Sequence, residues 1–157
     1  MTRFLILGLI SCALFLERSA LSQESVMVRV RIVRADDKSL IGFKSFVKSP
    51  QLDPAISDLK DKLDTLPFEH FVLISSEERL LPLKKKETIQ FAGGQLLHLR
   101  PILIEGDKVS LWLNWKDAKG QNILDTRMHF DSSQSMLAGT DSTDDTGLLL
   151  AINVKPE

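Results

Sequence analysis

Residues 87–140, ETIQFAGGQLLHLRPILIEGDKVSLWLNWKDAKGQNILDTRMHFDSSQSMLAGT, decide the fold of this chain. Apolar and polar residues alternate in short runs within this segment, and Gly- and Asp-rich turns join the runs. A period of two places one face of a strand in the core and the other in solvent. In residues 109–115 the apolar set is Val109, Leu111, Leu113 and Trp115, and the opposite set is Ser110, Trp112 and Asn114. The segment therefore predicts several antiparallel strands.

Turn residues divide the segment further. Gly93-Gly94 predicts a turn or a bulge, and residues 105–108 and 117–120 predict hairpin turns. Pro101 interrupts the strand predicted over residues 95–104, so it should lie at an edge or a bulge. Residues 122–130 predict the next strand, residues 135–138 a short one, and residues 139–147 a polar loop.

The residues on either side predict more strands. Residues 25–35 alternate, with Arg29 and Arg31 opposite the valines, and we expect both arginines to be solvated. Residues 68–74 predict a strand followed by a polar turn over 75–79, and residues 80–83 continue it weakly. Residues 148–154 are almost continuously apolar and suit a central closing strand. Residues 39–50 fit a strand or an irregular crossing equally well.

One helix is predicted, over residues 53–66. Asp53 suits the N-cap and Pro54 the first helical position. The apolar residues recur at helical spacing and are Ile56, Leu59, Leu63 and Leu66. Asp58 and Lys62 form a favourable i,i+4 pair, and Pro67 ends the helix. The fold class is therefore mainly β, an antiparallel sheet or small β-sandwich with one short α-helix that should lie against the sheet.

The N-terminus has the features of an export signal. A basic start, the apolar run of residues 4–16 and the small residues at 20–22 predict a cleaved signal peptide over residues 1–22. Residues 23–157 then form a single β-rich exported domain, located in the periplasm, the cell envelope or the extracellular space. An uncleaved anchor is one alternative. A lipoprotein is another, because residues 9–12 resemble a lipobox ending at Cys12; membrane contact is expected only in these two cases.

Composition narrows the function classes. The net charge of −1 gives no global electrostatic case for a nucleic-acid partner. Lys84, Lys85 and Lys86 form the one run of like charge. They either contact an anionic lipid or phosphate or keep an edge strand from pairing, and we favour the second interpretation. Cys12 is the one cysteine, so the mature domain has no disulfide, thiolate metal site or cysteine nucleophile.

No catalytic residue or cofactor site is predicted. His70, His98 and His129 are scattered over three predicted strands without metal-ligand spacing. Nucleophile-elbow, P-loop and dinucleotide-binding motifs are absent from the sequence. The best metal candidates are the hard oxygen ligands Asp141, Asp144 and Asp145, but a solvated turn explains their loop as well.

Trp112 is the candidate interface residue. It lies opposite the core-facing set of its predicted strand, where an exposed tryptophan is typical of a binding hot spot. The alternative is that it packs beneath the predicted helix.

Part of the chain resembles a known family. Residues 91–102, FAGGQLLHLRPI, resemble the secretin segment in which a glycine precedes an apolar strand ending in proline, and residues 105–113 resemble its next hairpin. Residues 126–139 are similar to the end of that family's C-terminal β domain, although Ser133 and Thr140 replace two glycines. Secretins are outer-membrane ring channels of type II and III secretion and pilus systems. The resemblance implies a secretin-like β fold or a secretion-system accessory protein.

Three functions follow as hypotheses. The first is a non-catalytic exported domain that contacts a protein partner in the envelope. One way to make this contact is for a strand of the domain to extend a sheet of the partner. The second is an exported metal-dependent hydrolase centred on the histidines or on residues 141–145. The third is a carbohydrate- or ligand-binding sandwich that uses Trp112 or Trp115.

Overall fold

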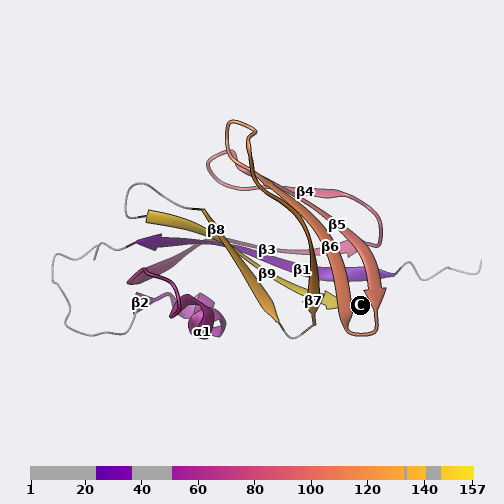
Figure 1. Ribbon diagram of the computed structural model, residues 1–157, viewed down its shortest axis with the longest axis horizontal. Helices are drawn as coiled ribbons and strands as arrows, with labels where there is room; N and C mark the ends of the chain where they lie inside the picture. The colour runs from indigo at the N-terminus through magenta and orange to yellow at the C-terminus, as the bar shows by residue number, and fades with distance from the viewer. Residues whose placement is uncertain (1–23, 37–50, 133, 141–145) are drawn as a thin grey trace, which may run out of the picture.

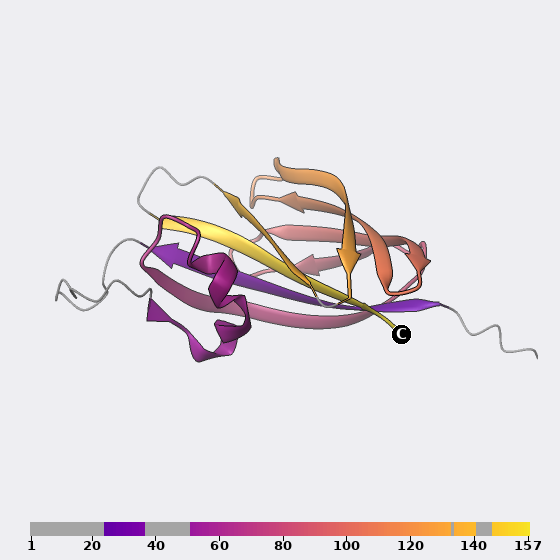
Figure 2. The ribbon, with the colours of Figure 1, turned by 60° about the horizontal axis from the view of Figure 1, so that its bottom comes forward.

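The alternating runs fold into two β-sheets that pack against each other (Figures 1 and 2). The structure, a computed structural model, describes residues 24–36, 51–132, 134–140 and 146–157. Sheet A has the strand order β2-β3-β1-β9-β8, and sheet B has the order β4-β5-β6-β7. The prediction of a mainly β fold is confirmed, and of the two predicted forms the structure is the small sandwich.

The strands of sheet A are β1 (Ser25–Asp36), β2 (Gln51–Leu52), β3 (His70–Pro82), β8 (Ser135–Thr140) and β9 (Thr146–Pro156). The strands of sheet B are β4 (Glu87–Gln90), β5 (Leu96–Glu105), β6 (Lys108–Lys116) and β7 (Asn122–Asp131). Neighbouring strands are antiparallel except β2 and β3, which are parallel. β9 lies between β1 and β8, so the predicted central position of residues 148–154 is confirmed.

The main core lies between the sheets. Its buried side chains come from alternate positions, as the period of two predicts. Those of sheet A include Val26, Val28, Val30, Ile32 and Leu150, and those of sheet B include Leu97, Leu99, Leu111, Leu113 and Trp115. Burying an aliphatic or aromatic side chain of this size stabilises a fold by roughly 1.5–3 kcal/mol. This core is therefore the main source of stability in a domain for which no disulfide is predicted.

β3 is longer than the sequence predicts. Residues 75–79 were expected to form a turn, but they continue the strand and pair with residues 28–32 of β1. The turn prediction is wrong because a segment with polar side chains can still form a strand when its backbone pairs with a neighbouring strand. Arg79 also forms an ion pair with Glu77 along the strand. A register shift between Ile32 and Val33 leaves Ile74 as the extra residue of a bulge.

The predicted helix is mostly a 3-10 helix. η1 (Pro54–Leu59) is followed by the four-residue α1 (Lys60–Leu63), with a kink at Ile56, whose φ is −124°. Asp53 caps the start as predicted, because its carboxylate accepts a hydrogen bond from the Ala55 amide at 3.0 Å. The helix ends at Leu63 and not at Leu66, although Leu66 also packs, partly buried, against the same group of side chains.

The helix covers one end of the outer face of sheet A (Figures 1 and 2). Ile56, Leu59 and Leu63 pack there against a second group of buried side chains. These are Val33, Ala35, Phe71, Leu149 and Ala151. β1 is therefore buried on both faces over residues 30–33, and the predicted packing of the helix against the sheet is confirmed.

Arg31 is buried at the margin of this second core. The expectation that it is solvated is wrong, because its side chain is only 5% exposed and donates two hydrogen bonds, of 2.6 and 2.7 Å, to the Asp58 carboxylate on η1. Arg29, two residues earlier, is half exposed as expected. The predicted Asp58–Lys62 pair is absent, since Asp58 binds Arg31 and the i,i+4 ion pair joins Lys60 to Asp64. The Arg31 hydrogen bonds lower the pKa of Asp58.

Several other sequence predictions concern segments that lie partly or wholly outside the described residues. β8 continues through Thr140 and β9 begins at Thr146, so the predicted polar loop over 139–147 is shorter than expected. Asp141, Asp144 and Asp145 lie outside the described residues. So do the predicted signal peptide, Cys12 and residues 39–50.

We expect the two partners of the Arg31–Asp58 pair to differ in their contributions to stability. Asp58→Ala leaves a buried guanidinium without its counter-charge and should lower the free energy of unfolding by about 2 kcal/mol. Arg31→Met fills the same space with an apolar chain and leaves a carboxylate that is 54% exposed to water, so it should cost about 1 kcal/mol or less. Urea unfolding measures both.

Asp61→Ala is the matched control, because Asp61 is an exposed carboxylate of α1, which directly follows η1. Its effect should stay within about 0.5 kcal/mol. A larger loss for Arg31→Met than for Asp58→Ala would contradict this account of the pair.

We expect a methyl group at Gly147 to displace Phe68. A Cβ atom there would lie 2.8 Å from Phe68 Cζ, and overpacking of this kind costs roughly 1–3 kcal/mol. Gly139→Ala is the control, since its close contact, at 2.9 Å, would be with Cδ2 at the end of the Leu149 side chain, and its contact with Leu148 O, at 3.9 Å, is an ordinary one. Thermal unfolding should show the larger loss for Gly147→Ala, and Phe68→Leu in the same chain should restore part of it.

Candidate functional site on the outer face of sheet B

The outer face of sheet B is the surface on which the predicted interface residue lies. The one described helix packs on sheet A, and no described helix or strand covers this side of sheet B. The side chains of this face come from positions that alternate with the core residues. They are His98, Arg100 and Leu103 of β5, Ser110, Trp112, Asn114 and Lys116 of β6, and Asp125, Arg127 and His129 of β7.

Trp112 lies at the middle of a row that crosses the strands. Its backbone pairs with Arg100 on β5 and with Arg127 on β7. The Arg100 guanidinium lies over the indole at 5.4 Å from the ring centroid, and the Lys86 ammonium lies at 5.8 Å. Contacts of this type stabilise by about 0.5–1 kcal/mol each at exposed sites. Two unlike segments, the lysine run and β5, therefore converge on one aromatic ring.

A hydrogen bond from the side of β7 fixes the orientation of the Trp112 ring. Its Nε1 donates a hydrogen bond of 2.9 Å to Asp125 Oδ1 on β7. The ring is half-buried by its neighbours. The alternative that Trp112 packs beneath the helix is excluded, because the helix belongs to the opposite sheet.

Trp115 cannot serve as a surface contact. It is completely buried in the main core, and its Nε1 donates to Gln95 Oε1 at 3.2 Å. The hypothesis of a ligand site on either tryptophan therefore reduces to Trp112. Alternation along β6 correctly assigned the two rings to opposite faces.

Two buried polar side chains support the row. Arg127 Nε donates to Ser110 Oγ at 2.8 Å, and Asn114 Nδ2 donates to Asn122 Oδ1 at 3.0 Å. Ser110 and Asn114 are each only 4% exposed, although they lie on the outer face. This burial was not predictable from the sequence, because it depends on which residues of the neighbouring strands lie beside Ser110 and Asn114.

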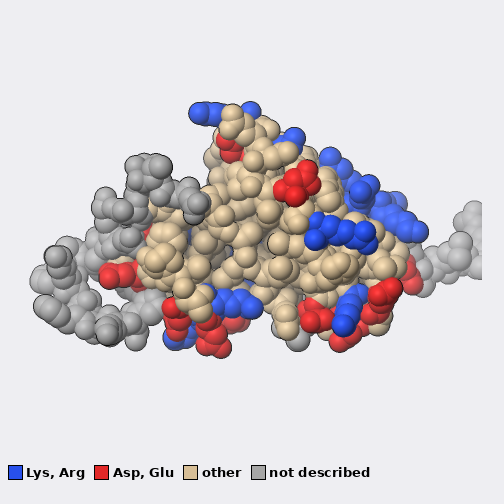
Figure 3. Space-filling view, in the orientation of Figure 1, with Lys and Arg blue, Asp and Glu red and all other residues tan. Residues whose placement is uncertain are grey.

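Among the described residues, the cations of this face have no carboxylate partner. The five ion pairs among the described residues all lie on sheet A or its helix, and none involves Lys86, Arg100, Lys116 or Arg127. Figure 3 shows Lys and Arg side chains gathered along the side of the molecule where β4 and β5 lie. The face therefore concentrates positive charge on a chain whose net charge is −1.

The pKa of His98 is sensitive to this positive charge. Nδ1 of His98 and Thr88 Oγ1 on β4 form a hydrogen bond of 2.8 Å. Burial lowers the pKa of His98, and the positive charges of Lys86 and Lys116 lower this pKa further. Both effects favour the neutral form of His98.

The described residues offer no metal centre. Within residues 24–36, 51–132, 134–140 and 146–157, no group of three or more His, Cys, Asp or Glu side chains could hold an ion. His70 lies on β3, in the other sheet from His98 and His129. The described residues therefore do not support the hypothesis of an enzyme centred on the histidines. The metal site at the carboxylates of residues 141, 144 and 145 remains a prediction.

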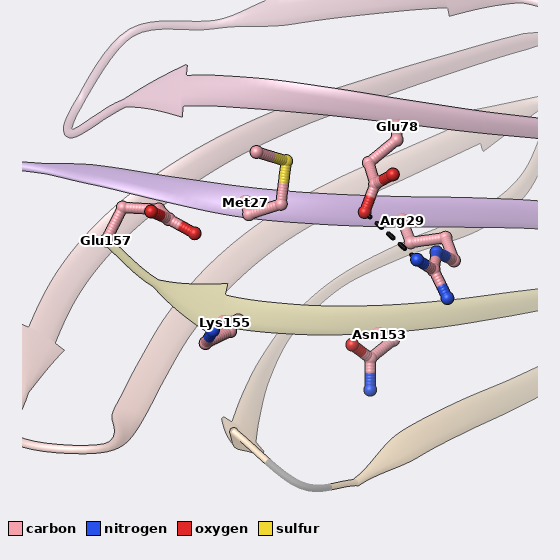
Figure 4. A pocket seen from close by; sticks show the side chains of 6 residues that line it. All are labelled: Met27, Arg29, Glu78, Asn153, Lys155 and Glu157. Atoms are coloured by element: carbon pink, nitrogen blue, oxygen red, sulfur yellow. Dashed lines mark hydrogen bonds and ion pairs between the residues drawn. The ribbon is translucent and has the colours of Figure 1, made fainter.

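A second surface, on sheet A, has a different character. A shallow depression there is lined by Met27, Arg29, Glu78, Asn153, Lys155 and Glu157 (Figure 4). Its arginine is bonded to Glu78 at 3.2 Å, and both side chains are about half exposed. The depression has mixed charge and no aromatic residue, so it lacks the features that single out the outer face of sheet B.

Comparison of the chain with protein-family models, with curated proteins and with solved structures found no match. Among the residues that the structure describes, no helix has the length and apolar character needed to cross a membrane.

We expect the pKa of His98 to rise when its cationic neighbours lose their charge. Lys86→Gln and Lys116→Gln each remove one repulsive charge, so each should move the pKa of His98 upward toward the ordinary value of 6.5. Burial remains in both variants, so the rise should be partial. NMR titration of the ring protons measures it, and Lys155→Gln on sheet A is the control. An unchanged pKa in both variants would show that these lysines do not act on His98.

Proposed function

We propose that this chain is a non-catalytic exported β-sandwich domain that acts by contact with another protein, and that the outer face of sheet B is the contact surface. The observation that carries the proposal is Trp112, a half-buried ring on a sheet face that no described helix or strand covers. Asp125 holds it on one side, and Arg100 and Lys86 lie over it. Tryptophan and arginine are the side chains enriched where protein interfaces gain most of their binding energy.

Export rests on the sequence of residues 1–22, with its basic start, apolar run and small residues before the expected cleavage site. The resemblance of residues 91–139 to secretins favours a partner in the envelope, such as a component of a secretion system. In that setting the chain is an accessory protein, because the resemblance covers only part of one secretin domain.

A carbohydrate- or ligand-binding sandwich is the second candidate, and Trp112 is again the observation that favours it. Sugars stack on the open face of an aromatic ring. Here two cations already lie over the ring of Trp112, whereas tryptophan with neighbouring arginines suits a protein interface. We therefore rank protein contact first.

Photo-crosslinking in the producing cell tests the protein-contact proposal. A photoreactive amino acid replaces Leu103, which is 42% exposed and pairs with Ser110 on the outer face of sheet B. We expect a discrete protein adduct, and Trp112→Ala in the same chain should abolish it because the central contact is lost. Mass spectrometry identifies the captured protein and the segment bonded to the probe.

Leu80 supplies the matched control, since it is a leucine that is 56% exposed on sheet A. No adduct at position 103, or the same adduct from both positions, would overturn the proposal. The N-terminal residue of the purified mature protein, read in the same preparation, tests cleavage near residue 22.

A further inference from the structure

The arginines of the two sheets differ in their ion pairing. Sheet A has four described arginines, and each forms an ion pair with a carboxylate: Arg29, Arg31, Arg34 and Arg79. Sheet B has two, Arg100 and Arg127, and neither has a carboxylate within ion-pair distance among the described residues. Both flank Trp112 in the same cross-strand row.

Among the described residues, Asp125 is the carboxylate near the middle of this row. One of its oxygens accepts the hydrogen bond from Trp112 Nε1. The cations that share the surface are Lys86, Arg100, Lys116 and Arg127. The row therefore has an excess of positive charge that nothing in the described chain neutralises.

We propose that the outer face of sheet B binds an extended, carboxylate-rich segment of its partner, with Arg100 and Arg127 binding carboxylates on either side of Trp112. This inference rests on the proposed function and adds the chemical class of the partner. The planar guanidinium forms paired hydrogen bonds to a carboxylate, which adds geometric specificity to the charge attraction.

The strand spacing sets the pattern that such a segment needs. Adjacent strands lie about 4.8 Å apart, so Arg100 and Arg127, one strand on each side of Trp112, are separated by roughly 10 Å at the backbone. A chain in the polyproline II conformation rises about 3.1 Å per residue and has three residues per turn, so its side chains at every third position lie on one side, about 9 Å apart. Acidic residues at every third position of such a segment, where it crosses the strands, therefore match the two arginines, and the backbone between them passes Trp112.

A short acidic segment suits this face better than a long polyanion. Binding of nucleic acid draws on many phosphate contacts and on a positive field over the whole molecule. The chain as a whole is slightly negative, so its attraction for an anion is local to this face. The two arginines and two lysines are enough for a peptide contact of a few residues.

Peptide binding to the purified mature protein tests the inference. The probe is a short peptide with glutamate at every third position and apolar residues between, and its counterpart has glutamine in place of glutamate. We expect the glutamate peptide to change the emission of Trp112, because Trp115 is buried. The affinity should fall as salt is raised and should be lower by about tenfold or more in Arg100→Gln.

Two variants control for non-specific effects. Lys155→Gln removes an exposed cation from sheet A and should leave the affinity unchanged. Arg127→Gln is the second test, but it also removes the hydrogen bond to Ser110, so its unfolding midpoint is measured alongside its affinity. Arg100 donates no described side-chain hydrogen bond, which makes Arg100→Gln the cleaner variant.

Equal binding of the glutamine peptide, or no response to either peptide, would overturn the inference. So would tighter binding of a polysulfated glycan or a single-stranded oligonucleotide with the same dependence on Arg100. If the adduct at position 103 maps to a partner segment without acidic residues, this inference fails while the protein-contact proposal stands. If no adduct forms in the cell, the protein-contact proposal itself fails, whatever peptide binds in solution.

Discussion

The burial of β1 on both of its faces is the constraint on which the rest of the structure depends. Its valines at 26, 28 and 30 enter the core between the sheets, and Val33 and Ala35 enter the second core beneath the helix. Because the chain places its one described helix there, none is left for the outer face of sheet B. That face must be compatible with solvent, and a half-buried tryptophan among polar and charged side chains satisfies this requirement.

The sequence predicts features that a single strand determines and misses those that depend on a distant partner. Alternation along β6 separates Trp112 from Trp115 without any knowledge of the neighbouring strands. The burial of Arg31 could not be predicted, because it depends on Asp58 arriving from the helix. Residues 75–79 were predicted to be a turn because their polar sequence does not show that they pair with β1, and this pairing makes them part of a strand.

The candidate site was predictable only in its central residue. The bulge at Pro101 explains why, since it leaves Ile102 as an extra residue and returns Leu103 to the side of the sheet that carries Arg100. Proline in this strand suggested a bulge or an edge, but the sequence does not say which residue is the extra one. The convergence of Lys86 and Arg100 on Trp112 depends on that register and on the turn between β3 and β4.

The contacts within the row favour a preorganised binding surface. Ordering a long side chain on binding costs about 0.5–1.5 kcal/mol, and here much of that cost has been met in the free protein. Asp125 fixes the indole, Ser110 accepts a hydrogen bond from Arg127, and the indole supports Arg100. These partners are a neutral hydroxyl and an aromatic ring, so they position the guanidinium groups without neutralising their charge. A row built in this way retains its full attraction for carboxylates.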